Sequence, residues 1–244
     1  MAINFIFGSV LLVSLISLIG VFTLSISERK LKKSLFLLVS FSVGVLLGDV
    51  FFHLLPETIE STGFSLQTSG SILLAILVFF ALEKWIQWHH HHHVGEAEDI
   101  HSFGYLNIFA DALHNFLDGI IIAGSYLVSI PIGITTTIAV VFHEIPQEIG
   151  DFGILLKSGF SKAEAIKYNF LSALTAIIGA FLGILFSSQV TGFSAFLIPF
   201  TAGSFLYIAG ADLIPELQKE EGATFLQFTA IVLGMLVMLG LVFL

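Results

Sequence analysis

Two stretches of the sequence decide the fold: DALHNFLDG at residues 111–119 and HEIPQEIGD at residues 143–151. Each lies inside a long apolar segment, and each repeats ionisable and amide side chains at helical spacing. Residues three and four positions apart share one face of an α-helix. Each stretch therefore predicts a helix that carries a polar stripe on an otherwise apolar surface.

The composition around these stretches is that of a membrane protein. Hydrophobic residues make up 56% of the chain and charged residues 11%, with a mean hydropathy of +0.99. These values favour a membrane protein over a soluble one. The net charge of -9 is spread along the chain without a basic face, which argues against a nucleic-acid partner. Because the chain has no cysteine, any metal ion has to be held by nitrogen and oxygen atoms.

Eight apolar segments are long enough to span a membrane, since a spanning helix needs about 20 mostly apolar residues. They cover residues 3–26, 34–56, 69–88, 103–127, 131–156, 163–186, 193–214 and 223–244. The first lacks a basic flank and is too long for a signal-peptide core, so we expect an uncleaved span. The sequence predicts an all-α membrane protein, an eight-helix bundle that forms one transmembrane domain over residues 1–244.

The basic residues predict the orientation. With eight spans, all nine fall on the side of the loops after spans one, three, five and seven: Arg29, Lys30, Lys32, Lys33, Lys84, Lys157, Lys162, Lys167 and Lys219. Cytoplasmic loops carry the excess of Lys and Arg. We therefore expect the cell (inner) membrane, with both termini outside the cytoplasm.

A histidine run lies between the third and fourth spans. His89, His90, His91, His92 and His93 are followed by acidic residues and His101, which predicts a cytoplasmic metal-binding loop over residues 89–101. Such a run is expected to buffer ions, because it imposes no single coordination geometry. A solvated linker and an engineering artefact are the alternatives.

The two polar stripes fall near the middle of the fourth and fifth spans. A charged side chain at that depth costs roughly 2.5 kcal/mol or more on insertion scales, so these residues should face the interior of the bundle. Asp118, Glu144 and Glu148 supply negative charge there, and no Lys or Arg lies at that depth. A divalent cation would balance them. The alternative is that carboxylates and histidines pair only to hold helices together.

The spacing of the ligands fits coordination. Each helix offers a pair of donors four residues apart, His114 with Asp118 and His143 with Gln147. Asn115 and Glu144 lie one residue further round and would form a second adjacent site, with Asp118 and Gln147 as bridges. This donor set favours Zn²⁺, with Fe²⁺, Mn²⁺ and Cd²⁺ as further candidates, and argues against copper(I).

Pro146 lies inside the fifth span. A proline removes a helical hydrogen bond, so a kink is expected there, with a free carbonyl at Phe142 that lines a wet cavity. A kink that serves packing alone is the alternative.

The second and seventh spans share a short pattern, GDVFFHLLPE at residues 48–57 and GADLIPE at residues 210–216, in opposite orientations. Inverted repeats of this kind are typical of transporters, so spans 1–3 and 6–8 are predicted to be repeats around the central pair 4–5. Chance similarity is the alternative for so short a pattern. The pathway residues expected are Asp49, His53 and Glu57 on the outer route, and Asp212, Glu216, Asp111, Glu148 and Asp151 on the inner one.

These motifs resemble those of the ZIP (Zrt-, Irt-like protein) metal-ion transporters over the whole chain. The resemblance rests on HNFLDG, HEIPQEIGD, GDVFFHLLPE and TAGSFLYIAGADLIPE, and is closest to the subfamily whose fifth span reads HExPHExGD. It implies a binuclear midplane site on His114, Asn115, Asp118, His143, Glu144 and Gln147, and transport of divalent ions, most readily zinc, into the cytoplasm. Gln147 departs from the pattern, because that position is usually histidine in the subfamily.

Two other functions fit parts of the sequence. An intramembrane zinc hydrolase would need HExxH, and here the second histidine is replaced by Gln147. A metal sensor would keep the central site without the two polar routes. We expect a transporter using alternating access and not an enzyme, with divalent ions and the lipid bilayer as partners and a homodimer left open.

Overall fold

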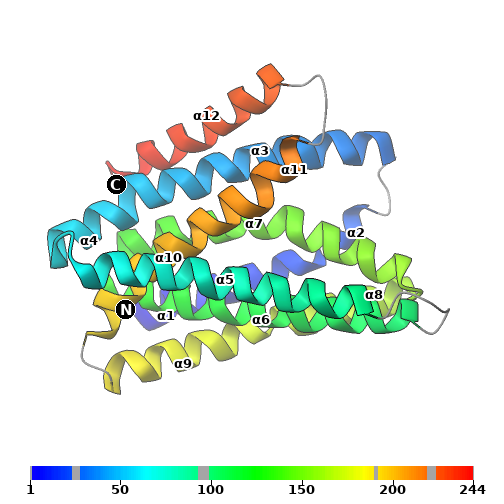
Figure 1. The fold of residues 1–244 in the computed structure, drawn as a ribbon, viewed down its shortest axis with the longest axis horizontal. Helices are drawn as coiled ribbons and strands as arrows, with labels where there is room; N and C mark the ends of the chain where they lie inside the picture. Colours follow the sequence, from blue (N-terminus) through cyan, green and yellow to red (C-terminus); the bar gives the residue numbers. More distant parts are fainter. Residues whose placement is uncertain (1, 24–27, 93–98, 190–191, 219–223, 244) are drawn as a thin grey trace.

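The structure, a computed structural model, describes residues 2–23, 28–92, 99–189, 192–218 and 224–243. Within these residues every regular element is helical, and most of the long helices run in roughly the same direction or its reverse (Figure 1). The first half contains α1 (Ala2–Ile16), a 3₁₀ turn (Ser17–Ile19), α2 (Gly20–Thr23), α3 (Glu28–Asp49), a π-helical turn (Val50–Leu54), α4 (Leu55–Thr62), α5 (Leu66–His92) and α6 (Asp99–Val128). The second half contains α7 (Ile130–Lys157), α8 (Lys162–Ala173), α9 (Thr175–Gln189), α10 (Phe193–Tyr207), a second π-helical turn (Ile208–Leu213), α11 (Ile214–Gln218) and α12 (Thr224–Leu241).

These elements correspond in order to the eight predicted spans, so the all-α prediction is confirmed for the described residues. Within the part of the chain that the structure describes, four stretches are individually long and apolar enough to cross a membrane: Ala2–Ile19, Ser34–Thr62, Leu66–Lys84 and Lys162–Ser187. The helices α6 and α7 are 30 and 28 residues long and carry the two polar stripes.

The boundary at the histidine run differs from the prediction. Helix α5 continues through His92, and α6 begins at Asp99, so His89–His92 and His101 lie in helices. His93 and the residues up to position 98 lie outside the described residues. Histidine is a moderate helix former, and nothing in the run breaks a helix.

The second and seventh spans share an unpredicted feature, a π-helical turn that ends two residues before the proline of the Pro-Glu pair. The backbone N–H of Leu55 bonds to the carbonyl of Val50, and that of Ile214 bonds to the carbonyl of Ala209. A proline cannot donate to the carbonyl four residues earlier, and its ring crowds that carbonyl. A wider π-helical turn accommodates the missing hydrogen bond and the proline ring without ending the helix.

The packing of neighbouring helices also matches between the two predicted repeats. Helix α3 packs on α12, and α10 packs on α5, while α3 and α10 run in opposite directions (Figure 1). A Cβ atom at Gly44 would collide with the backbone carbonyl of Ile231, and one at Gly203 with that of Ile72. Gly44 and Gly203 stand at the same distance in sequence before the prolines of their spans. The two spans therefore share a glycine packed against the backbone of a neighbouring helix as well as their π-helical turn, which supports the inverted repeat.

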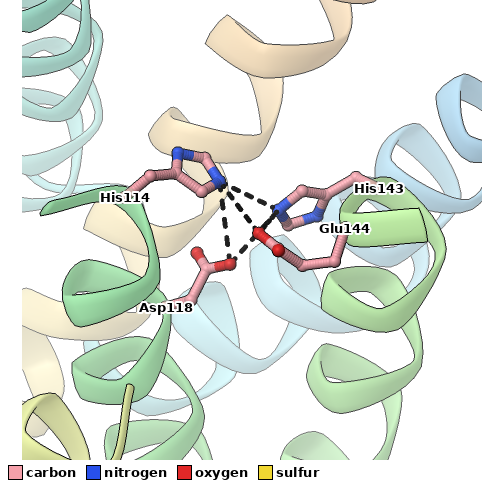
Figure 2. A group of neighbouring side chains, drawn as sticks. All are labelled: His114, Asp118, His143 and Glu144. Carbon is pink, nitrogen blue, oxygen red and sulfur yellow. Dashed lines mark hydrogen bonds and ion pairs between the residues drawn. The ribbon is translucent and has the colours of Figure 1, made fainter. Parts of the chain in front are cut away.

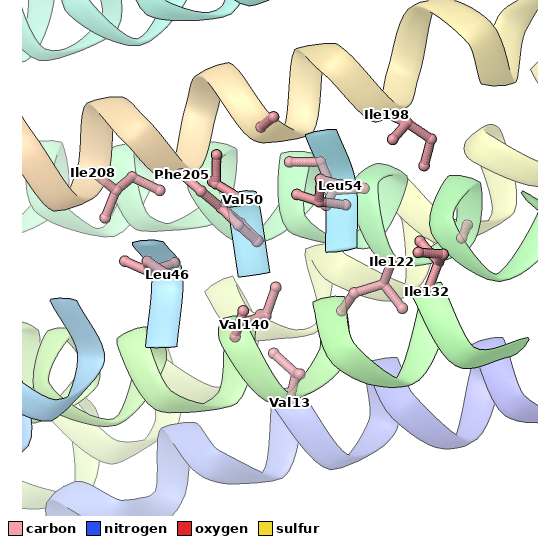
Figure 3. Close-up of a cluster of buried hydrophobic side chains, with 14 of the residues drawn as sticks. Val13, Leu46, Val50, Leu54, Ile122, Ile132, Val140, Ile198, Phe205 and Ile208 are labelled. Atoms are coloured by element: carbon pink, nitrogen blue, oxygen red, sulfur yellow. The ribbon is translucent and has the colours of Figure 1, made fainter. Parts of the chain in front are cut away.

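The two central helices are joined at Ser129 alone. This residue caps α7, because its side chain accepts a hydrogen bond from the backbone N–H of Ile132 at 3.2 Å. So short a connection makes α6 and α7 antiparallel neighbours. Buried side chains such as Leu54, Ile122 and Ile132 pack around this end of the pair (Figure 3).

Helix α7 continues past Pro146 from Ile130 to Lys157. The carbonyl of Phe142, which we expected to line a wet cavity, instead accepts a hydrogen bond from the hydroxyl of Ser42 on α3 at 2.5 Å. Hydroxyl side chains on neighbouring helices are one means by which freed backbone groups are satisfied at membrane depth.

Candidate metal centre

Four of the predicted ligands come together between α6 and α7. His114 and Asp118 lie one turn apart on α6, and His143 and Glu144 are adjacent on α7. All four side chains point toward one another (Figure 2), and one ligand atom from each lies within 4.8 Å of all the others. Helical spacing places each pair on one face, and the antiparallel packing of α6 and α7 joins the two pairs.

The distances within this cluster are those of a compact coordination shell. The two Nε2 atoms of His114 and His143 are 3.2 Å apart. Asp118 Oδ2 lies 3.2 Å from His143 Nε2 and 3.7 Å from His114 Nε2. Glu144 Oε1 lies 3.3 Å from His114 Nε2 and 3.6 Å from His143 Nε2. A tetrahedral zinc site with bonds of roughly 2.0–2.2 Å separates its ligand atoms by about 3.3–3.6 Å, so the cluster already has the dimensions of such a shell.

His143 is held in a ligand orientation by its own helix. Its Nδ1 lies 3.1 Å from the carbonyl oxygen of Ala139, so Nδ1–H donates there and Nε2 is left with a lone pair facing the cluster. Metal-binding histidines in proteins commonly use their second nitrogen in this way. The ring edges of Phe205 and Phe79 pack against His143 and His114 and form apolar walls.

The carboxylates of the cluster are buried without neutral donors. Asp118 and Glu144 are 0% exposed, and neither carboxylate has a hydrogen-bond partner. Among the ion pairs of the described residues, these two carboxylates meet only His114 and His143. Buried charge without a counter-ion is costly, and a divalent cation at the centre would neutralise both carboxylates.

The remaining two predicted ligands lie around this cluster. Gln147 lines a cavity beside His114. Asn115 is fully buried on α6, where its side-chain N–H donates to Asp111. The sequence analysis grouped Glu144 with Asn115 in a second site, whereas the structure brings Glu144 to both histidines.

Helix α8 forms a third wall that the sequence analysis missed. Asn169 donates to Glu148 Oε2 at 2.5 Å, and the hydroxyl of Ser172 donates to Asp111 Oδ2. On α6, Asn107 similarly donates to Asp151 at 3.0 Å. Neutral donors thus hold three of the five carboxylates predicted on the inner route. The signal for this wall was present in the sequence, since Asn169 and Ser172 stand three residues apart in an amphipathic segment.

A cavity of about 390 Å³ leads away from the cluster. Its lining includes His114 and Gln147 at the cluster and Asp111, Asp151 and Glu83 further along. From His114, the cavity extends toward the start of α6 and the end of α7, which is the side where the sequence carries its basic residues. Toward the end of α6 and the start of α7, buried apolar side chains such as Leu54, Ile122 and Ile132 pack together (Figure 3).

On that packed side, Asp49 and His53 form a separate buried pair. His53 Nδ1 lies 3.3 Å from Asp49 Oδ1, and the side chains of His53 and Asp49 are 7% and 0% exposed, respectively. None of their four polar atoms has a hydrogen-bond partner. Glu57 lies one turn beyond His53, half-buried on α4.

For the two inner-route residues of the seventh span, the structure describes the backbone only. Asp212 lies in the second π-helical turn and Glu216 in α11. Their side chains lie outside what the structure describes.

Comparison with known proteins gives the family. A family model described as "ZIP Zinc transporter" matches residues 3–102 and 87–242. The chain is 40% identical over 198 residues to "Zinc transporter ZIP13" of Pongo abelii, covering 75% of this chain and 59% of that protein. It is 37% identical over 212 residues to "Zinc transporter YKE4" of Saccharomyces cerevisiae, covering 75% and 61%. It is 33% identical over 301 residues to "Zinc transporter ZIP13 homolog" of Drosophila melanogaster, covering 91% and 85%.

The chain spans about three-fifths of the length of the first two of these relatives and most of the third. The family match takes in both halves of the chain, including both stretches that form the cluster. The protein is a multi-pass membrane protein, and the chain belongs to the ZIP zinc transporter family.

Proposed function

We propose that the protein carries divalent metal ions, most readily zinc, across the cell (inner) membrane into the cytoplasm by alternating access. The observation that carries this proposal is the four-atom cluster of His114, Asp118, His143 and Glu144. Two imidazole nitrogens and two carboxylate oxygens form a donor set that suits Zn²⁺. Both helices of the cluster belong to the membrane-spanning bundle, so an ion bound there lies between the two sides.

The surroundings of the cluster support alternating access. A cavity reaches His114 and Gln147 from one side, and apolar packing closes the other. A carrier that exposes its site to one side at a time needs this asymmetry. With the basic ends of the helices in the cytoplasm, the cavity corresponds to an inward-facing state, and both termini lie outside.

The polar residues on either side supply a route. Asp49, His53 and Glu57 would receive an ion on the outer side, where Asp49 and His53 form a buried ion pair. Asp111 and Asp151 line the inner cavity, and Glu148, Asp212 and Glu216 would continue the inner route. Polar side chains inside a membrane are costly and mark ion pathways.

The other predicted features fit the same function. Gln147 is a neutral oxygen donor on the cavity wall and would take part as the ion leaves. The residues His89–His93 would buffer released ions at the cytoplasmic end of α5. Fe²⁺, Mn²⁺ and Cd²⁺ accept the same donors and are further candidate substrates.

The test is metal uptake into proteoliposomes, measured with a trapped metal-sensitive dye across a panel of divalent ions, with a pH gradient present and absent. We expect zinc to enter, and His143→Ala and Asp118→Ala to abolish uptake while the variants elute from gel filtration as the wild type does. Undiminished uptake by either variant would contradict the proposal. Dependence on the pH gradient would add proton coupling to the mechanism.

A further inference from the structure

Asn115 is held in one orientation by Asp111, one turn earlier on α6. Its side-chain nitrogen Nδ2 lies 2.8 Å from Asp111 Oδ1 and 3.2 Å from the backbone carbonyl oxygen of Asp111. Both of these oxygens are acceptors, so the amide has to face them with its N–H₂ group rather than its oxygen. Asp111 therefore fixes which way the amide of Asn115 points.

The fixed orientation leaves the other end of the amide free. Asn115 is 0% exposed, and its Oδ1 has no hydrogen-bond partner. A buried carbonyl oxygen without a partner is costly unless something binds it. Asn115 precedes Asp118 by three residues, so its side chain lies on the helix face that carries this clustered residue.

Both carboxylate oxygens of Asp111 already accept hydrogen bonds. One carboxylate oxygen accepts from Asn115 and the other from the hydroxyl of Ser172 on α8. The side chain is 4% exposed, and it is not one of the four clustered ligands. A carboxylate whose two oxygens are both engaged by neutral donors is better suited to hold a ligand in place than to coordinate an ion directly.

We propose that Asp111 is a positioning residue, which locks the amide of Asn115 so that Oδ1 is presented to the cation at the cluster. This rests on the proposed function, because it assumes that the cluster binds a divalent ion. Ser172 of α8 completes the arrangement by fixing Asp111. Partners behind metal ligands set the orientation of those ligands, and their loss commonly lowers metal affinity by about 10–100-fold.

A double-mutant cycle tests the proposal, with Zn²⁺ affinity of the purified full-length protein measured by calorimetry in detergent. We expect Asp111→Ala and Asn115→Ala each to weaken binding by about tenfold or more. We expect the double variant to be no weaker than Asn115→Ala within about twofold, because Asp111 acts only through Asn115. Asp111→Asn should recover most of the affinity, since an amide oxygen still accepts from Asn115.

Thr201→Ala is the matched control, because it removes a buried hydroxyl on α10 that bonds only within its own helix. Thermal unfolding of every variant separates loss of affinity from loss of fold, and Asp111→Leu replaces Asp111→Ala in the cycle if the latter does not fold. The proposal would be overturned if the losses of zinc affinity from the two single substitutions multiplied in the double variant. It would also be overturned if Asp111→Asn bound zinc as weakly as Asp111→Ala. Asp118→Ala distinguishes failure of the proposed function from failure of the positioning role. Unchanged zinc affinity in Asp118→Ala would contradict the proposed function itself. Lost affinity in Asp118→Ala together with wild-type affinity in Asp111→Ala would contradict only the positioning role of Asp111.

Discussion

The hydroxyl of Ser42 on α3 donates to the carbonyl oxygen of Phe142 on α7 at 2.5 Å. That carbonyl is the one that Pro146 leaves without its helical donor, because proline has no backbone N–H. The bond lies directly before His143 in the chain, so it secures the backbone of α7 next to the proposed metal ligands. Beside this bond, the rings of Phe41 and Phe142 pack edge to face with their centroids 4.8 Å apart.

Ser42→Ala should therefore destabilise the protein by about 1 kcal/mol, the usual net effect of such a hydrogen bond. The same substitution in a Pro146→Ala background should cost less, because the new N–H at position 146 can reach the Phe142 carbonyl. Unfolding in mixed detergent measures both. Equal costs in the two backgrounds would mean that the Ser42 hydroxyl does not compensate for Pro146.

The two close glycine contacts should respond alike to a methyl group. Gly44→Ala and Gly203→Ala each place a Cβ on a backbone carbonyl of the partner helix, so each should destabilise by about 1–3 kcal/mol. Gly70→Ala on α5 is the control, since a Cβ there meets nothing within 4 Å. That control should be neutral or stabilising by up to about 1 kcal/mol. A marked cost at one contact and none at the other would contradict the equivalence of the two repeats.

Gln147→His should tighten zinc binding. The substitution puts an imidazole on the cavity wall one turn from His143 and beside His114. We expect an increase in affinity of about tenfold, which corresponds to about 1.4 kcal/mol. Calorimetry with Zn²⁺ measures it, and an unchanged affinity would remove position 147 from the ligand set.

His53→Ala and Asp49→Asn should slow zinc entry and leave the central site intact. The pair lies apart from the cluster, on the side that is closed by apolar packing. We expect the initial uptake rate to fall about tenfold, equivalent to about 1.4 kcal/mol on the barrier, while zinc affinity in detergent changes by less than about twofold.

The control for the outer pair is Thr58→Ala, which removes a buried hydroxyl that bonds only to Leu54 of the same span. Wild-type uptake rates in both His53→Ala and Asp49→Asn would exclude this pair from the pathway.

The sequence was sufficient for the features that depend on one helix at a time. The pairing of His114 with Asp118 on one face follows from helical periodicity alone, as does the apolar length of each span. The structure confirms that these helices exist, and brings the two faces together. The family resemblance is confirmed by the comparisons.

Features that depend on contacts between helices were missed or assigned differently. The bonds from Asn169 and Ser172 to the inner carboxylates need the packing of α8 against α6 and α7, which periodicity does not encode. Ser42 lies far in sequence from the carbonyl that it satisfies. The approach of Glu144 to both histidines likewise depends on how α7 packs against α6.

The most direct test of the central claim is zinc K-edge X-ray absorption on purified protein loaded with one equivalent of Zn²⁺. The four clustered atoms and Asn115 Oδ1 together predict five nitrogen and oxygen ligands at about 2.0–2.2 Å, with the multiple scattering of two imidazole rings from His114 and His143. His143→Ala should remove one of the two imidazole contributions. A spectrum of six-coordinate hydrated zinc, or one that His143→Ala leaves unchanged, would contradict the assignment of this cluster as the metal site.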